Sequence, residues 1–255
     1  MVVKMIITDY SKIAHNYDKN KDRNDISKDE LIGSLYNFDN RDFRVLDLSC
    51  GTGNYLKKQI NEYPKSVYEI EWIGIDKSND MLRIAKGKNL DANLLIADVI
   101  DIPLKKNSVN YIKNMYAFHH YLEKEKAVKE MYRILKKNGI INLINSNHEY
   151  MRYSWVYKYF PSAYDLDNER KPKINEYYEI FEKNGFKIDL KIIVTVQKFM
   201  YKDIIEKVIN RDISQLNIVT EEEYTKGIKK ITVDMSKNES VISDLAIMEM
   251  NGYKK

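Results

Sequence analysis

Short apolar runs alternate with longer amphipathic stretches between residues 44 and 144. The runs are rich in Val, Ile and Leu, which is typical of buried strands, whereas apolar residues three and four positions apart indicate helices between them. Strands that alternate with helices favour a mostly parallel sheet with right-handed crossovers. The pattern predicts strands at 44–48, 68–75, 93–97, 109–114 and 140–144, and helices at 54–63, after Ser78, and at 123–137, the last capped by Asn138 and Gly139.

The alternation becomes less regular after residue 146. Segment 147–171 is rich in Tyr and Trp and too long for an ordinary connection, so we expect a lid or substrate segment there. Helical pieces are expected at 7–35, and further elements are predicted at 173–184, 201–210 and 220–230 (helices) and at 186–196 and 240–250 (strands). The predicted fold class is therefore α/β, with a Rossmann-like seven-stranded mostly parallel sheet, helices on both faces, and N-terminal and C-terminal helical lid segments.

Composition narrows the class of protein. With 44% hydrophobic and 31% charged residues, the chain has the balance of a soluble globular protein. Its 42 basic and 38 acidic side chains are interleaved, which disfavours a nucleic-acid partner because that would need clustered Lys and Arg. The single cysteine, Cys50, suits a reducing compartment. No apolar run approaches the roughly 18–20 residues of a membrane span, and no signal peptide is evident, so we expect a cytoplasmic protein.

Polar and glycine residues follow four of the predicted strands. They are the turn at residues 49–53, Asp76, Asp98 and Asn114. Ligands of open parallel sheets bind outside the carboxyl ends of the strands, so we expect these residues to converge on one edge.

The turn Ser49-Cys50-Gly51-Thr52-Gly53 joins a predicted strand to a predicted helix. Glycines in such a turn let backbone N–H groups come close to a ligand. Ser49 stands where a first glycine is usual, and there is no third glycine as in the dinucleotide fingerprint. A nicotinamide dehydrogenase is therefore disfavoured.

Two acidic residues, Asp76 and Asp98, indicate that the ligand at this edge of the sheet is a nucleoside. Asp76 can accept hydrogen bonds from both hydroxyls of a ribose, or it caps the helix that begins near Ser78. Asp98 can accept a hydrogen bond from the exocyclic amine of adenine, or it is a turn aspartate.

Five segments taken in order resemble the class I S-adenosylmethionine-dependent methyltransferases, in particular the ubiquinone/menaquinone-type and small-molecule enzymes. They are Val-Leu-Asp-Leu-Ser-Cys-Gly-Thr-Gly, Gly-Ile-Asp-Lys-Ser, Ala-Asp-Val, Ala-Phe-His-His-Tyr and Arg-Ile-Leu-Lys-Lys-Asn-Gly. The resemblance covers about residues 7–144. It implies a single methyltransferase domain, with residues 1–40 as an N-terminal helical cap, 41–146 as the cofactor-binding core, and 147–255 as substrate or lid segments with the remaining strands.

The resemblance also implies the cofactor, S-adenosyl-L-methionine, which leaves as S-adenosyl-L-homocysteine. In the family the glycine turn faces the methionine part, the second-strand acid holds the ribose and the third-strand acid holds adenine. The implied cofactor-binding residues are Tyr17, Ser49, Gly51, Thr52, Gly53, Asp76, Lys77, Met81, Asp98, Val99 and Asn114.

The adjacent histidines His119 and His120 follow the fourth predicted strand and are the candidate catalytic residues. A histidine suits a general base because its pKa lies near neutral pH, although either ring can instead pack or cap structure. No metal site is expected, because the four histidines and one cysteine lack the spacing of zinc ligands. The candidate substrate-binding residues are Tyr10, Tyr116, Trp155 and Tyr157.

The predicted function is in-line methyl transfer to a small-molecule acceptor. A cofactor-binding protein that transfers no methyl group is an alternative. An RNA methyltransferase is a second alternative, disfavoured by the weak basic clustering and by Asn-Met-Tyr-Ala in place of an Asn-Pro-Pro-Tyr-like signature after the fourth strand. The acceptor and the oligomeric state are not written in the sequence.

Overall fold

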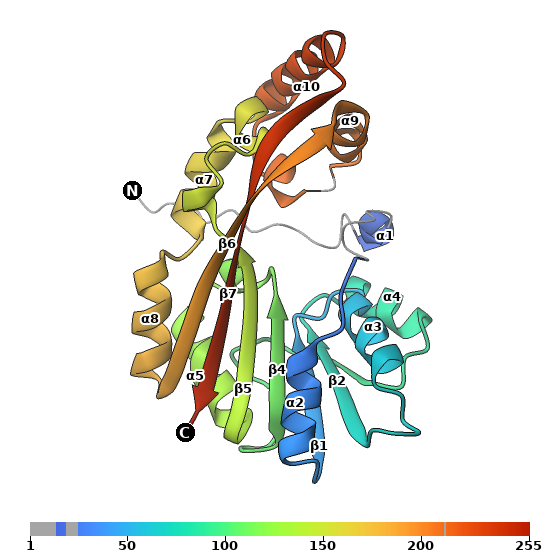
Figure 1. Cartoon of the computed structure of the whole chain (residues 1–255), viewed down its shortest axis with the longest axis vertical. Helices are drawn as coiled ribbons and strands as arrows, with labels where there is room; N and C mark the ends of the chain where they lie inside the picture. The colour runs from blue at the N-terminus through green and yellow to red at the C-terminus, as the bar shows by residue number, and fades with distance from the viewer. Residues whose placement is uncertain (1–13, 19–24, 212) are drawn as a thin grey trace. The chain divides into compact units, whose positions relative to one another are not determined.

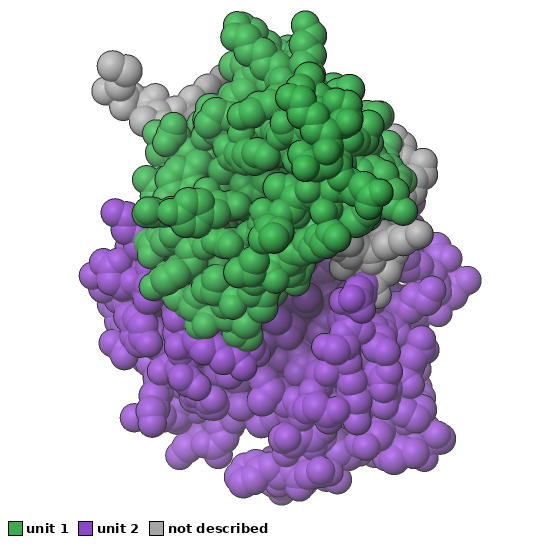
Figure 2. Space-filling model, turned by 45° about the horizontal axis from the view of Figure 1, so that its top comes forward, with its two compact units in different colours: residues 1–9, 146–172, 192–248 green, residues 10–145, 173–191, 249–255 purple. Residues whose placement is uncertain are grey.

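The computed structural model describes residues 14–18, 25–211 and 213–255. Tyr10, which we predicted to contact substrate, lies outside the described residues. The chain divides into two compact units (Figure 2). Unit 1 comprises Met1–Asp9, Ser146–Pro172 and Ile192–Met248, and unit 2 comprises Tyr10–Asn145, Lys173–Lys191 and Glu249–Lys255. One unit boundary lies between Asn145 and Ser146, one residue before the division expected after residue 146. The single domain and its subdivision stay predictions.

A seven-stranded sheet has the order β3-β2-β1-β4-β5-β7-β6. β1 pairs in parallel with β2 and β4, and these pair in parallel with β3 and β5. β7 runs opposite to β5 and β6 (Figure 1). This confirms the predicted mostly parallel α/β sheet. The strands are β1 (Phe43–Leu48), β2 (Ile70–Asp76), β3 (Asn93–Ile96), β4 (Val109–Met115), β5 (Leu135–Ser146), β6 (Phe186–Met200) and β7 (Ser240–Lys254).

Helices cover both faces of the sheet in unit 2. In Figure 1, α2 lies in front of the strands and α5 lies behind them. The predicted cap at Ser78 is confirmed, because its side chain accepts a hydrogen bond from the N–H of Met81. The helices of unit 2 are α1 (Ala14–Tyr17), α2 (Glu30–Phe38), α3 (Asn54–Glu62), α4 (Asn79–Gly87), the 3-10 helix η3 (Phe118–His120), α5 (Lys124–Ile134) and α8 (Ile174–Lys183).

The helix predicted at 123–137 is too long. α5 ends at Ile134, and β5 begins at Leu135, so Asn138 and Gly139 lie inside a strand and do not cap the helix. The backbone at Gly139 passes close to β4, where an added Cβ would lie 2.9 Å from the carbonyl oxygen of Asn110. Leu135 pairs with Val109 of β4 and Ile140 pairs with Tyr111, with an irregular register between the two pairs. Strand pairing on both sides of residues 136–139 therefore overrides their helical pattern.

Unit 1 contains the predicted lid segment 147–171, which is largely helical. The helices of the whole unit are η4 (His148–Tyr150), α6 (Trp155–Tyr159), α7 (Ser162–Arg170), α9 (Tyr201–Ile209), η5 (Ser214–Asn217) and α10 (Glu221–Met235). Aromatic and aliphatic side chains from α6, α9 and α10 form a separate hydrophobic core in unit 1. Among the helices that the structure describes, none combines the length and apolar character needed to cross a membrane.

β4 is buried along six of its seven residues, as expected for a central parallel strand. It nevertheless contains Asn110, Lys113 and Asn114, all buried. Buried polar groups must be hydrogen-bonded, and a buried charge must be paired. The partners of Lys113 therefore decide how the neighbouring elements are arranged.

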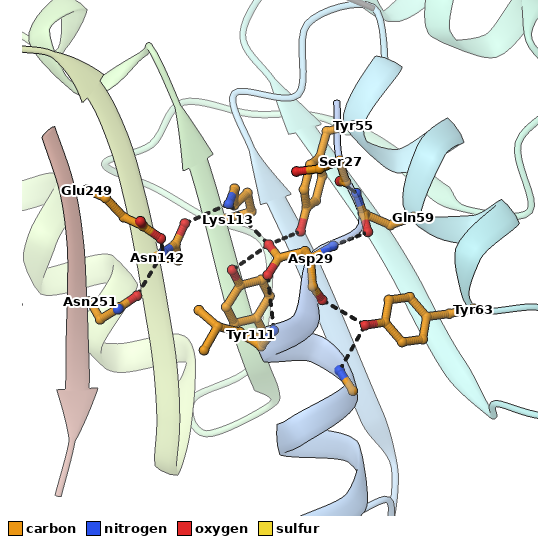
Figure 3. A network of polar contacts seen from close by, with 12 residues as sticks. Ser27, Asp29, Tyr55, Gln59, Tyr63, Tyr111, Lys113, Asn142, Glu249 and Asn251 are labelled. Atoms are coloured by element: carbon orange, nitrogen blue, oxygen red, sulfur yellow. Dashed lines mark hydrogen bonds and ion pairs between the residues drawn. The ribbon is translucent and has the colours of Figure 1, made fainter. Parts of the chain in front are cut away.

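Asp29, the residue that caps α2, supplies the negative charge (Figure 3). Its Oδ2 accepts hydrogen bonds from the hydroxyls of Tyr55 and Tyr111, at 2.8 and 2.7 Å, and lies 3.1 Å from Nζ of Lys113. Its N–H donates to Oε1 of Gln59 at 2.8 Å. One carboxylate thus joins the start of α2 to α3 and to β4.

The network continues across the sheet through Asn142 of β5. Nζ of Lys113 donates to Oδ1 of Asn142 at 2.6 Å, and Nδ2 of Asn142 donates to Glu249 and Asn251 of β7 at 2.8 and 2.7 Å. Figure 3 shows these side chains in line across the strands. Lys113 of β4 is therefore a structural support.

Replacing Asp29 with Asn should destabilise the protein strongly, because Lys113 would keep its charge without a counterion. Breaking a buried ion pair from one side costs about 3–5 kcal/mol. The free energy of unfolding in urea measures the loss. Asp25→Asn, at an exposed position of the same segment, is the matched control and should change stability little. Equal stabilities for the two variants would contradict the role given to Asp29.

Candidate cofactor site

The turn after β1 is held against the end of β2 by backbone hydrogen bonds. The N–H groups of Ser49 and Cys50 both donate to the carbonyl oxygen of Ile75, at 2.7 and 3.0 Å. Ser49, Gly51 and Gly53 have φ angles of 65°, 54° and 76°, in the left-handed region. The chain therefore reverses sharply between β1 and α3, as the glycines predicted.

The two glycines of the turn meet different surroundings. A Cβ at Gly53 would lie 3.0 Å from Cδ1 of Leu90 and 3.3 Å from Cβ of Ala85, so packing against α4 restricts this position. A Cβ at Gly51 would meet no described atom within 4 Å. The backbone at Gly51 is therefore open to the approach of a ligand.

The Asp76 carboxylate lies directly against this turn. Its Oδ2 accepts a hydrogen bond from the N–H of Gly51 at 2.8 Å, and its Oδ1 accepts one from the N–H of Ser78 at 2.8 Å. Burial raises the pKa of Asp76, while the backbone donors oppose that shift. Each carboxylate oxygen has a second lone pair, so both can still accept from a ligand hydroxyl.

Asp98 follows β3 at the same edge of the sheet, since the N–H of Ala97 donates to the carbonyl oxygen of Asp76 at 3.3 Å. Oδ2 of Asp98 accepts from Nζ of Lys77 at 2.7 Å, and Oδ1 accepts from the N–H of Ile100 at 3.3 Å. Partial burial raises the pKa of Asp98, but these donors outweigh it and lower the pKa. Two predicted site residues, Lys77 and Asp98, thus form an ion pair.

Asn114 connects the end of β4 to the turn. Its Nδ2 donates to the carbonyl oxygen of Leu48 and to the hydroxyl of Tyr121, both at 2.8 Å. The Tyr121 hydroxyl also shares a hydrogen bond of 2.7 Å with Oγ of Ser49. Tyr121 was not among the predicted site residues, because nothing in the sequence indicates which partner its hydroxyl meets.

Two buried acceptors near these strand ends have no partner among the described residues: Oδ1 of Asn114 and Oδ2 of Asp47. Burial raises the pKa of Asp47 to about 8, and the charge of Asp76 adds to this. Unpaired buried acceptors are costly and indicate a missing donor. A ligand donor would satisfy either oxygen, and a cationic donor beside Asp47 would lower its pKa.

Asp18 is a further residue at the turn that the sequence did not single out. Its Oδ1 accepts from Oγ1 of Thr52 at 2.6 Å and from Nδ2 of Asn54 at 3.0 Å, and its Oδ2 lies 2.7 Å from Nζ of Lys88. Tyr17, the neighbouring predicted cofactor residue, ends α1, which contacts α4. Asp18 therefore ties the end of α1, in the predicted N-terminal helical cap, to the glycine turn.

His119 is buried in η3 and hydrogen-bonded to β5. Its Nδ1 lies 2.9 Å from Oδ1 of Asn145, and Nδ2 of Asn145 donates to the hydroxyl of Tyr177 on α8 at 3.2 Å. The rings of His119 and the half-buried His120 lie 3.9 Å apart. Asn145 and Tyr177 are far from His119 in sequence, so only the tertiary fold reveals this chain of contacts.

The remaining predicted site residues differ in how far they are buried. Met81 is buried in α4, and Val99 lies in the turn after Asp98. Tyr116 is 44% exposed at the end of β4, with a φ of 52°. Trp155 and Tyr157 belong to the core of unit 1.

Among the described residues, no group of three or more His, Cys, Asp or Glu is placed to hold a metal ion. The Asp76 carboxylate and the unpaired oxygens of Asp47 and Asn114 fit an organic ligand with hydroxyl and ammonium groups.

Comparison with known proteins identifies the family. A family model described as a methyltransferase domain matches residues 45–139. An uncharacterised methyltransferase of Oceanobacillus iheyensis is 31% identical over 191 residues, which cover 71% of this chain and 81% of that protein. A ubiquinone/menaquinone biosynthesis C-methyltransferase of Campylobacter jejuni is 29% identical, but the match spans 53% of this chain and only 61% of that relative's length. The chain belongs to the methyltransferase domain family.

Solved structures share the fold. A candidate methyltransferase from an antibiotic biosynthesis pathway of Anabaena variabilis has a TM-score of 0.66 at 16% identity, covering 89% of this chain and 98% of that one. Phosphoethanolamine N-methyltransferase 2 of Haemonchus contortus, in complex with S-adenosyl-L-methionine, has a TM-score of 0.55 at 17% identity, covering 96% of this chain and 57% of that one. The predicted Rossmann-like fold is confirmed.

The raised pKa of Asp47 predicts a pH dependence of stability. Its carboxyl is protonated below a pKa of about 8 in the folded protein, against 3.8 for an ordinary Asp. Its contribution to stability is full below pH 4 and is lost as the pH rises toward 8, by up to about 1.4 kcal/mol per pH unit. Unfolding in urea at pH 5, 6, 7 and 8 should therefore show a shallower decline for Asp47→Asn than for the wild type.

Asp91→Asn is the control for this series, because Asp91 is exposed and forms only a surface ion pair with Lys65. It should keep the wild-type slope. Identical slopes for the wild type and Asp47→Asn would show that Asp47 does not titrate in this range.

Proposed function

We propose that the protein is an S-adenosylmethionine-dependent methyltransferase that acts on a small-molecule acceptor. The observation that carries this proposal is the 2.8 Å hydrogen bond between the Gly51 N–H and the Asp76 carboxylate, beside a turn with open space at Gly51. A carboxylate fixed against a glycine turn suits a ribose next to a backbone-lined pocket. Membership of the methyltransferase domain family supports the same cofactor.

The residues of this site divide among the parts of the cofactor. Asp76 accepts from the ribose hydroxyls, while Asp98 accepts from the adenine amine, with Val99 beside the ring. The buried oxygen of Asn114 or of Asp47 accepts from the ammonium group of the methionine part. The proposed cofactor-binding residues are Tyr17, Ser49, Gly51, Thr52, Gly53, Asp76, Lys77, Met81, Asp98, Val99 and Asn114, with Asp47 added.

When bound, the cofactor supplies a methyl group that its sulfonium already activates. The chain must then align the acceptor, exclude water and take up a proton if the acceptor's nucleophile carries one. His119 is the proposed proton acceptor. Asn145 donates from Nδ2 to Tyr177, so its Oδ1 is an acceptor and Nδ1 of His119 carries the proton. The neutral ring then presents Nε2 as its basic atom.

The ring of His120 lies against that of His119, tilted by 43°, and His120 is the second candidate for this role. Tyr116, which follows β4, is proposed to contact the acceptor. Acceptor contacts of Tyr10, Trp155 and Tyr157 stay predictions from the sequence. The interleaved charges of the chain favour a small molecule over nucleic acid. A cytoplasmic location is proposed from the single cysteine, Cys50.

Release of S-adenosylhomocysteine tests this function. The wild type should release it with at least one member of a panel of small O-, N-, S- and C-nucleophiles. His119→Gln should lower kcat by roughly 100- to 10,000-fold, the usual contribution of a general base, and leave the Kd for S-adenosylmethionine unchanged. His120→Gln is the matched variant and should lower kcat less.

An unchanged kcat in His119→Gln would show that His119 is not the general base. Alignment of the acceptor with the cofactor would then account for the rate enhancement. Tight cofactor binding with no release for any acceptor would favour the alternative, a cofactor-binding protein that transfers no methyl group.

A further inference from the structure

Unit 1 contains a buried cluster of charged side chains around α7, separate in sequence from every residue assigned to the cofactor. It consists of Asp167, Arg170 and Lys171. Their side chains are 0%, 5% and 3% exposed. Two cations therefore share one carboxylate in a place that water hardly reaches.

The Asp167 carboxylate is already saturated. Its Oδ1 accepts from Nε of Arg170 at 2.6 Å and lies 2.5 Å from Nη2 of the same side chain. Its Oδ2 accepts from Lys171 at 3.0 Å, from the hydroxyl of Tyr157 at 2.8 Å and from Nε2 of Gln215 at 2.9 Å. Asp167 therefore has no capacity left for further donors.

Donors of the cluster remain in excess. Nη1 of Arg170 is buried and has no hydrogen-bond partner among the described residues. Nη2 of Arg170 reaches Oγ of Ser214 at 3.4 Å, and Nζ of Lys171 donates to Oγ of Ser146 at 2.8 Å. Hydroxyl groups satisfy donors but bring no negative charge, so one positive charge stays uncompensated.

The pKa shifts of Asp167 and Lys171 reflect the two cations and one carboxylate of the cluster. Burial raises the pKa of Asp167, but Lys171 and Arg170 outweigh it and lower the pKa to about 2, so the carboxylate is ionised. Burial lowers the pKa of Lys171; Asp167 opposes the shift and Arg170 adds to it. Among the described residues, no second acidic side chain acts on either group.

We propose that Arg170 and Lys171 form a binding site for an oxyanion, a carboxylate or phosphate group of a small molecule. The unpaired Nη1 supplies two N–H donors in the plane of the guanidinium, a geometry that matches carboxylate and phosphate oxygens. The Lys171 ammonium adds a second positive charge. A bound water would satisfy the donors of Nη1 but would leave the charge uncompensated.

Asp167 has a positioning role in this site. By binding Nε and Nη2 of Arg170, it fixes the plane of the guanidinium and leaves Nη1 for the ligand. Tyr157 and Gln215 hold Asp167 in turn. The site is built from unit 1 alone and does not depend on methyl transfer, so it can be tested separately from the proposed function.

Calorimetric titration of the full chain with inorganic phosphate and, separately, with acetate tests the site. Ionic strength is held constant with sodium chloride. We expect saturable binding of one anion per chain. Tighter binding of phosphate would assign the site to a phosphate-bearing ligand, and tighter binding of acetate to a carboxylate-bearing one. No saturable binding of either anion would overturn the proposal.

Variants of Arg170 locate the binding. Arg170→Met should weaken it at least tenfold, whereas Arg152→Met, the same change at an exposed position of unit 1, should leave it unchanged. Arg170→Lys keeps the charge beside Asp167 but lacks Nη1, and should also weaken binding if Arg170→Met does not fold. Thermal unfolding followed by circular dichroism verifies the fold of each variant. Wild-type affinity in a folded Arg170 variant would overturn the assignment.

Discussion

The hydrogen bond from the Gly51 N–H to Oδ2 of Asp76 is the contact on which the organisation of the site depends. It joins the turn after β1 to the residue that ends β2. Two further backbone donors of the turn converge on the carbonyl oxygen of Ile75, so the turn has three attachments to one strand end. Packing at Gly53 fixes its far side, while Gly51 faces open space. The result is a rigid backbone loop with one accessible position and a carboxylate beside it.

Behind this loop, the polar residues of β4 form two systems with different roles. Lys113 is paired with Asp29 and linked through Asn142 to β7, so its charge is compensated. Asn114 and Asp47 are different, because each keeps a buried oxygen without a partner. Perturbed and unsatisfied groups that gather at strand ends are typical of binding sites. The same reasoning distinguishes Asp167, which is saturated, from Nη1 of Arg170, which is not.

The sequence predicted what depends on local pattern. The alternating runs gave the strands and most helices of the core, and the glycine turn, Asp76 and Asp98 lie at adjacent strand ends as expected. The end of α5 was mispredicted, because Leu135 pairs with Val109 of β4 and the chain continues as β5, a tertiary effect that overrides helical spacing. Where local pattern decides the conformation, the prediction succeeds.

Contacts between distant residues could not be foreseen. Asn145 and Tyr177 reach the site from segments that show no motif, and their roles depend on which partner the fold brings within hydrogen-bond distance. Tyr157 was expected to line an acceptor pocket from its aromatic character, and the structure reveals a hydroxyl bound to Asp167. Residue type alone does not determine which neighbour a polar group will meet.

Calorimetric titration with S-adenosylmethionine, on the wild type and on Asp76→Asn, tests the central claim most directly. The wild type should bind one molecule per chain. Asp76→Asn removes the charge that strengthens the ribose contacts, worth about 1.5–3 kcal/mol, and should bind roughly 10- to 150-fold more weakly. Asp80→Asn, which loses only a surface pair with Arg83, should bind like the wild type. No binding by the wild type, or equal binding by Asp76→Asn, would contradict the account.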